Sequence, residues 1–221
     1  KMTKDVLKLT VDADIQFLIR EELLRFKEVF RAKGSAAILM DVNNGAIISM
    51  VSLPDFNLNE RKAITNIDYI NRATKGVYEF GSVFKTFTVA AAFNENLIEP
   101  NTEYLNLKKQ IKCNGFSIRE FSEKIPTNLT VEEILIRSGN IGSVRIGQKI
   151  GEEKFKSFLK KIGVQGTIDF DIQEVGKPTP INWGKCKLAT VSYGHGITTT
   201  LLQLAKGYSI VTNGGYDINP T

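Results

Sequence analysis

A serine and a lysine three positions apart are the most reactive pair in the sequence. Ser82 and Lys85 stand in Gly81-Ser82-Val83-Phe84-Lys85, at the head of an almost wholly apolar run, residues 83–93. On a helix, residues three apart share one face, so the hydroxyl and the amine are expected one turn apart. A serine hydroxyl needs a nearby base to act as a nucleophile, and only neutral lysine can be that base. Burial among apolar side chains would lower the pKa of Lys85, so the pair predicts a serine nucleophile with a lysine base.

A second polar motif, Ser138-Gly139-Asn140, offers a hydroxyl and an amide. These groups can relay a proton and hold a substrate carbonyl. Taken alone, each motif also fits an ordinary structural role. Ser82 could cap a helix while Lys85 extends its amine to water, and the second motif could be a turn that ends a helix.

The elements that must position these residues follow from apolar spacing and turn signals. Residues 7–12 alternate as a short strand, and residues 15–30 form an amphipathic helix that Gly34 should end. The runs 36–40 and 46–51 flank Asn-Gly and predict a hairpin with both faces covered. Thr130 and Glu133 have the pattern of a capping box at the start of a short helix. Further helices are expected at residues 83–93, 141–150, 152–162 and 198–211.

Composition narrows the possible classes of protein. The chain has 221 residues, is 42% hydrophobic and carries a net charge of +5, which suits either a lysine-rich solvated surface or an anionic polymer or membrane. No basic run is interleaved with aromatics, so nucleic acid is not an expected partner. With a single histidine, His195, and two cysteines outside any metal-binding spacing, no metal site is expected. The sequence leaves open whether Cys113 and Cys186 pair.

The two motifs occur in the order typical of penicillin-binding proteins, whose signature set is S-x-x-K, S-x-N and K-T-G. Ser138 follows Ser82 by 56 residues (138 minus 82). The chain resembles class B penicillin-binding proteins, the peptidoglycan D,D-transpeptidases, and is most similar to the division-specific septal type. Other stretches that resemble the family are Thr10–Gln16, Ala37–Pro54, Asn71–Ala73, Glu79–Ser82, Ser192–Ile197 and Leu201–Ala205.

This resemblance implies an α/β (α+β) fold of the penicillin-binding protein transpeptidase and serine β-lactamase type. An antiparallel sheet is then flanked by helices, with a helical subdomain at roughly residues 86–190 of a single domain, 1–221. Ser82 would be the nucleophile, Lys85 its base, Ser138 the proton relay and Asn140 the residue that orients the acyl-enzyme. Ser82 and Asn140 would also contact substrate. No cofactor and no metal are implied.

Two departures from the family pattern bear on these expectations. Phe80 stands where the family usually has proline before the nucleophile. No Lys-Thr-Gly or Lys-Ser-Gly that could serve as the third motif occurs in the chain. The domain is therefore expected to be incomplete at its C-terminal end. A fragment of these 221 residues, lacking part of its oxyanion hole, is expected to be inactive alone.

The resemblance also implies partners, a location and alternatives. The partners are peptidoglycan stem peptides, β-lactam antibiotics and, in the full-length protein, membrane-anchored division or elongation proteins. The location is the bacterial inner membrane, with a single-pass anchor outside this sequence and the catalytic domain facing the periplasm or cell exterior. A D,D-carboxypeptidase or a serine β-lactamase remains an alternative, as does a non-catalytic β-lactam sensor or division scaffold. His195 is not expected to act as a catalytic base, because it lies in a Gly-His-Gly loop. Trp183 is expected to pack in a loop and not to serve as a platform for a sugar.

Overall fold

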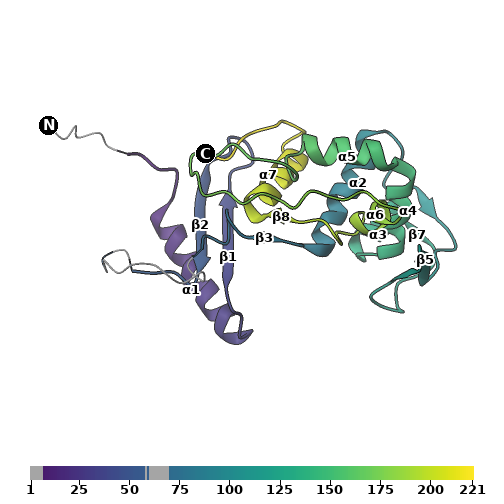
Figure 1. The fold of residues 1–221 in the computed structure, drawn as a ribbon, viewed down its shortest axis with the longest axis horizontal. Helices are drawn as coiled ribbons and strands as arrows, with labels where there is room; N and C mark the ends of the chain where they lie inside the picture. Colours follow the sequence, from purple (N-terminus) through teal and green to yellow (C-terminus); the bar gives the residue numbers. More distant parts are fainter. Residues whose placement is uncertain (1–6, 58, 60–69) are drawn as a thin grey trace. The chain divides into compact units, whose positions relative to one another are not determined.

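The computed structural model describes residues 7–57, 59 and 70–221, which form two compact units (Figure 1). The first unit comprises the described residues up to Val77 together with Thr167–Lys177 and Thr200–Thr221. The second unit comprises Tyr78–Gly166 and Pro178–Thr199. The chain passes from one unit to the other four times, after residues 77, 166, 177 and 199. The first and last of these crossings fall within two short strands, β3 (Val77–Tyr78) and β8 (Thr199–Thr200).

The first unit is built on the predicted hairpin, which is confirmed. Strands β1 (Ser35–Met40) and β2 (Ile47–Leu53) pair antiparallel. The turn between them closes with Gly45 at φ +80, a conformation that glycine adopts at little cost. Residues of β2 alternate between buried and partly exposed. The continuous apolar pattern predicted that both faces of the hairpin are covered. In β2, one face is buried and the other is only partly buried.

Helix α1 (Ala13–Val29) packs against β1 and β2, as predicted, and begins at Asp12, whose carboxylate accepts the backbone N–H groups of Asp14 and Ile15. Its predicted end at Gly34 is wrong. The helix stops at Val29 because Arg31 adopts a left-handed conformation, φ +50, and turns the chain away.

The predicted strand at residues 7–12 is also wrong, although this segment lies along β2. Only one ladder-type bond forms there, from the Asp12 N–H to the Ile48 carbonyl at 2.9 Å. Thr10 reaches the Ile47 carbonyl through its side-chain hydroxyl at 2.8 Å, so its backbone makes no such bond to β2. The segment bends at Thr10 and is not a strand.

Helix α7 (Leu201–Thr212) completes the first unit and packs against β1. It begins three residues later than predicted, because Thr200 and Gln203 form a capping box that fixes the first turn. Its buried Lys206 donates to Asn219 at 2.7 Å and pairs with Asp217 at 2.9 Å. The paired carboxylate offsets the cost of burying this cation.

The second unit is mainly helical, and its helices agree closely with prediction. Helix α2 packs against α3, α4 and α5, and α4 packs against α6 (Figure 1). The helices span Lys85–Asn94 (α2), Val131–Ile136 (α3), Asn140–Ile150 (α4), Glu152–Lys161 (α5) and Lys187–Val191 (α6), of which only α6 was not predicted. The capping box of Thr130 and Glu133 is confirmed at the start of α3.

Two small two-stranded sheets of the second unit, one of them a hairpin, were missed by the sequence analysis. Strands β5 (Gln110–Cys113) and β6 (Phe116–Arg119) pair antiparallel, and β4 (Glu103–Tyr104) pairs with β7 (Leu129–Thr130). The β5–β6 turn is Asn114-Gly115, with φ values of +47 and +86. This dipeptide is a strong hairpin signal, which the sequence analysis overlooked between strands of only four residues each.

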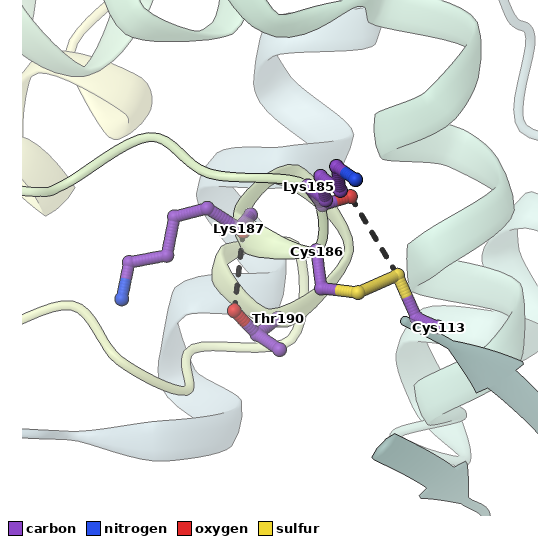
Figure 2. Close-up of a disulfide and its surroundings, with 5 residues drawn as sticks. All are labelled: Cys113, Lys185, Cys186, Lys187 and Thr190. Carbon is purple, nitrogen blue, oxygen red and sulfur yellow. Dashed lines mark hydrogen bonds between the residues drawn. A yellow bond between two sulfur atoms is a disulfide. The ribbon is translucent and has the colours of Figure 1, made fainter. Parts of the chain in front are cut away.

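A disulfide joins Cys113 and Cys186, which settles the pairing that the sequence left open (Figure 2). It ties the end of β5 to the residue that precedes α6, with the two Cα atoms 5.7 Å apart. The Lys185 carbonyl oxygen lies 3.7 Å from the Cys113 sulfur, and the Lys187 side chain extends away from the bridge. The β5–β6 hairpin is thereby linked covalently to the helical part of its unit.

Candidate active site

Ser82 lies in a short 3-10 helix, η2 (Gly81–Phe84), which leads directly into α2. The apolar run was predicted as one α-helix, but Gly81, at φ +62, makes the chain enter through a tighter turn. The backbone N–H of Lys85 bonds to the carbonyl of Ser82. In a 3-10 turn, residues three apart eclipse one another, so Ser82 and Lys85 lie on the same side. Ser82 is exposed, as a residue that meets a substrate must be.

The entrance to η2 is packed against a second loop of the same unit. Gly194, at φ +84, leaves no room for a Cβ atom, because that atom would collide with the carbonyl of Gly81. Beside it, His195 Nδ1 lies 3.3 Å from a Glu79 carboxylate oxygen, and its ring stacks on Tyr193. Burial, and secondarily the negative charge of Glu79, raise the pKa of Tyr193. His195 thus forms part of the packing around this entrance.

Lys85 is the buried centre of the site. Its side chain is 1% exposed, and its Nζ donates to three oxygens: the Ser138 carbonyl at 2.5 Å, the Ser138 hydroxyl at 2.9 Å and Asn140 Oδ1 at 2.7 Å. These bonds bring together three of the four residues that the motifs singled out. Ser82 stands one turn before Lys85, and among the described residues no hydrogen bond of its hydroxyl is formed.

Burial lowers the pKa of Lys85 to about 8, while the negative charge of Glu120 acts in the opposite direction and raises it. Taking an ammonium out of water disfavours its charged form. An amine with this pKa is neutral often enough at physiological pH to accept a proton. The electrostatics therefore suit a base for Ser82.

The second motif forms the sharp connection between α3 and α4. Ser138 adopts a left-handed conformation, φ +54, and its N–H bonds to the Leu135 carbonyl at 3.1 Å. The Gly139 N–H bonds to the Ile134 carbonyl at 2.9 Å, and α4 begins at the next residue. This turn directs both the hydroxyl and the amide of the motif toward Lys85.

Glu120 holds the start of α4 and was missed by the sequence analysis. Its two carboxylate oxygens accept the backbone N–H groups of Asn140 at 2.7 Å and Ile141 at 2.9 Å. The neighbouring carbonyl of Arg119 accepts the Asn140 side-chain amide at 2.8 Å. The Asn-Gly turn could have placed Glu120 just after a hairpin, but no sequence pattern joins that position to Asn140.

Comparison with known proteins shows the family to which this chain belongs. The family model of the penicillin-binding protein transpeptidase domain matches residues 35–221. The chain belongs to this family. A probable peptidoglycan D,D-transpeptidase FtsI of Caulobacter vibrioides is 29% identical over 210 residues, which are 94% of this chain and 35% of that protein. Stage V sporulation protein D of Bacillus subtilis is 29% identical over 215 residues, 95% of this chain and 33% of that protein.

Solved structures of similar proteins agree in fold. A peptidoglycan glycosyltransferase from Burkholderia ambifaria superposes with a TM-score of 0.85 at 26% identity, covering 97% of this chain and 64% of that one. The transpeptidase domain of penicillin-binding protein 3 from Burkholderia pseudomallei gives 0.79 at 28% identity, covering 91% and 57%. The predicted α/β fold of the penicillin-binding protein transpeptidases is thereby confirmed. The proposed extent of a helical subdomain, roughly 86–190, stays a prediction.

The departure at Phe80 does not disturb the local structure of this transpeptidase domain. Phe80 has φ −87 and precedes η2 where the family usually has proline, and its ring packs edge to face against Tyr78. The turn that carries Ser82 forms without proline because Gly81 supplies the unusual conformation.

The other side chains considered at the sequence level have structural surroundings. The Lys156 amine lies 5.1 Å from the centre of the Trp183 ring, a cation–π contact, so Trp183 packs within its unit. Among residues 7–57, 59 and 70–221, no group of His, Cys, Asp and Glu side chains is suited to bind a metal ion. In the same described part of the chain, no helix is both long and apolar enough to cross a membrane.

Proposed function

We propose that this chain supplies the serine acyl-transfer site of a peptidoglycan D,D-transpeptidase that cross-links stem peptides and is a target of penicillin. The observation that carries the proposal is the setting of Lys85. It is a buried lysine with a lowered pKa, one turn from an exposed serine and hydrogen-bonded to both polar residues of the second motif. The chain spans between 32% and 52% of the length of these curated relatives. The activity is therefore proposed for the complete gene product.

In the proposed acylation step, Ser82 attacks the carbonyl carbon between the two D-alanines of a donor stem peptide. The hydroxyl proton passes to neutral Lys85, one turn away. The tetrahedral adduct then expels the terminal D-alanine, and Ser138 passes a proton from Lys85 to the leaving amine. The Lys85–Ser138 distance of 2.9 Å supports this relay. An ester between Ser82 and the shortened peptide remains.

The proposed second step runs the same groups in reverse. The amine of another stem peptide attacks the ester carbonyl and gives its proton to Lys85 by way of Ser138. The bond between that carbon and the Ser82 oxygen then breaks, and Lys85 passes the proton to the Ser82 oxygen. The Asn140 amide has one N–H bonded to Arg119, and its second N–H can hold the acyl-enzyme. A β-lactam amide would occupy the donor position and acylate Ser82.

The setting proposed for this activity is the bacterial cell wall. The names of the relatives, FtsI and stage V sporulation protein D, support a division-type or sporulation-type transpeptidase. We propose an inner-membrane anchor, a catalytic domain on the outer side of that membrane, and membrane-anchored division proteins as partners.

The test is a reaction of the complete gene product with a synthetic donor pentapeptide and an amine-bearing acceptor peptide. A cross-linked product together with free D-alanine, both lost in Ser82→Ala, is expected. Free D-alanine without cross-linked product would instead identify a carboxypeptidase. No D-alanine from a correctly folded protein would reject the catalytic proposal and favour a scaffold.

A further inference from the structure

We propose that Glu120 is a positioning residue of this site, holding the Ser138-Gly139-Asn140 turn against Lys85 through the start of α4. The inference rests on the proposed function, because it concerns the same serine and lysine. Glu120 lies outside both motifs and belongs to a different element, since it directly follows β6. It therefore adds a residue to the site that the motifs do not contain.

The geometry at the start of α4 carries the proposal. A helix leaves its first backbone N–H groups without partners, and a side chain at the N-cap usually accepts from one of them. Here the N-cap is Gly139, which has no side chain to do so. The carboxylate of Glu120 takes that place with both oxygens, at 2.7 Å from the Asn140 nitrogen and 2.9 Å from the Ile141 nitrogen. Its negative charge also faces the positive end of the helix dipole.

The same hairpin holds the side chain of Asn140 as well as its backbone. The Arg119 carbonyl accepts from Asn140 Nδ2, which leaves Oδ1 directed at the Lys85 amine, 2.7 Å away. The backbone of Asn140 is thus held by Glu120, and its side-chain amide is held by the carbonyl of Arg119. An Asn140 that turned or withdrew would remove one of the three acceptors around Lys85.

The hairpin that presents Glu120 is itself anchored. The Glu120 N–H bonds to the Lys109 carbonyl at 3.0 Å, immediately before β5. At the other end of β5, the disulfide of Cys113 and Cys186 ties the hairpin to the start of α6. Glu120 is partly buried. The carboxylate is therefore presented by a constrained backbone.

Glu120 also acts on Lys85 through its charge. Its negative charge raises the pKa of Lys85 and so works against burial, which is the larger effect. The other charged residues next to these groups in sequence, Arg119 and Arg137, are exposed, and Ser138 and Asn140 are neutral. Removing the Glu120 charge should lower the pKa of Lys85, so that the amine becomes neutral at a lower pH.

The experiment measures the rate of acylation of the complete gene product by fluorescent penicillin, from pH 5.5 to 9.5. Glu120→Gln keeps the shape but turns an amide N–H toward a backbone N–H. We expect its acylation rate at pH 7 to fall roughly 10- to 100-fold, with the acid limb of the pH profile moved to lower pH. Glu123→Gln, an exposed residue of the same loop with the same change in charge, is the matched control and should match wild type.

Glu120→Asp separates position from charge, and it also serves if Glu120→Gln does not fold. It keeps the negative charge but shortens the reach, so we expect a lower rate with less movement of the acid limb than in the glutamine variant. Folded variants of Glu120 with the wild-type rate and the wild-type pH profile would overturn the inference while leaving the proposed function intact. A wild-type protein that penicillin does not label would instead remove the proposed function and the inference with it.

Discussion

The lowered pKa of Lys85 makes a quantitative prediction for the pH dependence of acylation. If the neutral amine is the base, the rate should follow the neutral fraction of Lys85. At a pKa of about 8, roughly one tenth of the lysine is neutral at pH 7, against about three in ten thousand for an ordinary lysine. The rate should therefore rise about tenfold per pH unit below pH 8 and level off above it.

The assay is the rate of acylation of the complete gene product by a penicillin under conditions where it is limited by chemistry. Lys85→Arg is the matched control, because arginine keeps the positive charge but stays protonated throughout this range. It should lose acylation at every pH tested. A wild-type rate that is unchanged between pH 6 and pH 8 would refute the assignment of Lys85 as the base.

The same shift has a consequence for stability, with a defined sign. Because the folded protein lowers the pKa of Lys85, it releases this proton more readily than the unfolded chain does. Between about pH 8 and the usual lysine pKa near 10.5, the unfolded state binds more protons at this group. Lys85 should therefore make the protein more stable as the pH rises through that window.

Two further predictions concern the framework of the site. Gly142→Ala would place a methyl group 2.6–2.8 Å from three side-chain atoms of the buried, β-branched Ile134. The overpacking cost of roughly 1–3 kcal/mol should outweigh the gain of about 1 kcal/mol in helix propensity and lower Tm. Gly139→Ala, whose added Cβ would have no atom closer than 3.7 Å, should leave Tm nearly unchanged. A higher Tm for Gly142→Ala would contradict this packing. Replacing Cys113 and Cys186 together by serine should cost roughly 2–4 kcal/mol of stability, and a Tm equal to wild type would contradict a formed disulfide.

Helices α3, α4 and α5 of the second unit could be predicted because each has a local signal at one of its ends. The capping box of Thr130 and Glu133 marks the start of α3, and the glycines at 151 and 163 mark the ends of α4 and α5. Where one residue's conformation overrides the pattern, the prediction failed. Arg31 ends α1 by adopting a left-handed conformation, which the presence of an arginine does not predict.

The four motif residues of the candidate site could be predicted from the sequence, but the contacts that hold them in place could not. Ser82, Lys85, Ser138 and Asn140 stand out by type and spacing, although whether they perform the proposed roles stays a prediction. The contact of Glu120 with the start of α4 joins positions 20 apart, with β7 and α3 between them, and depends on tertiary packing. No periodicity or local motif encodes such a contact, so only the structure could reveal it.

The most direct test of the central claim is to locate the acyl group that a penicillin leaves on the complete gene product. The protein would be incubated with the antibiotic, digested and mapped by mass spectrometry, with Ser82→Ala treated in the same way. A stable adduct on the peptide containing Ser82, and none in the variant, is the predicted result. An adduct on another residue, or the same labelling of Ser82→Ala, would contradict the assignment of Ser82 as the nucleophile.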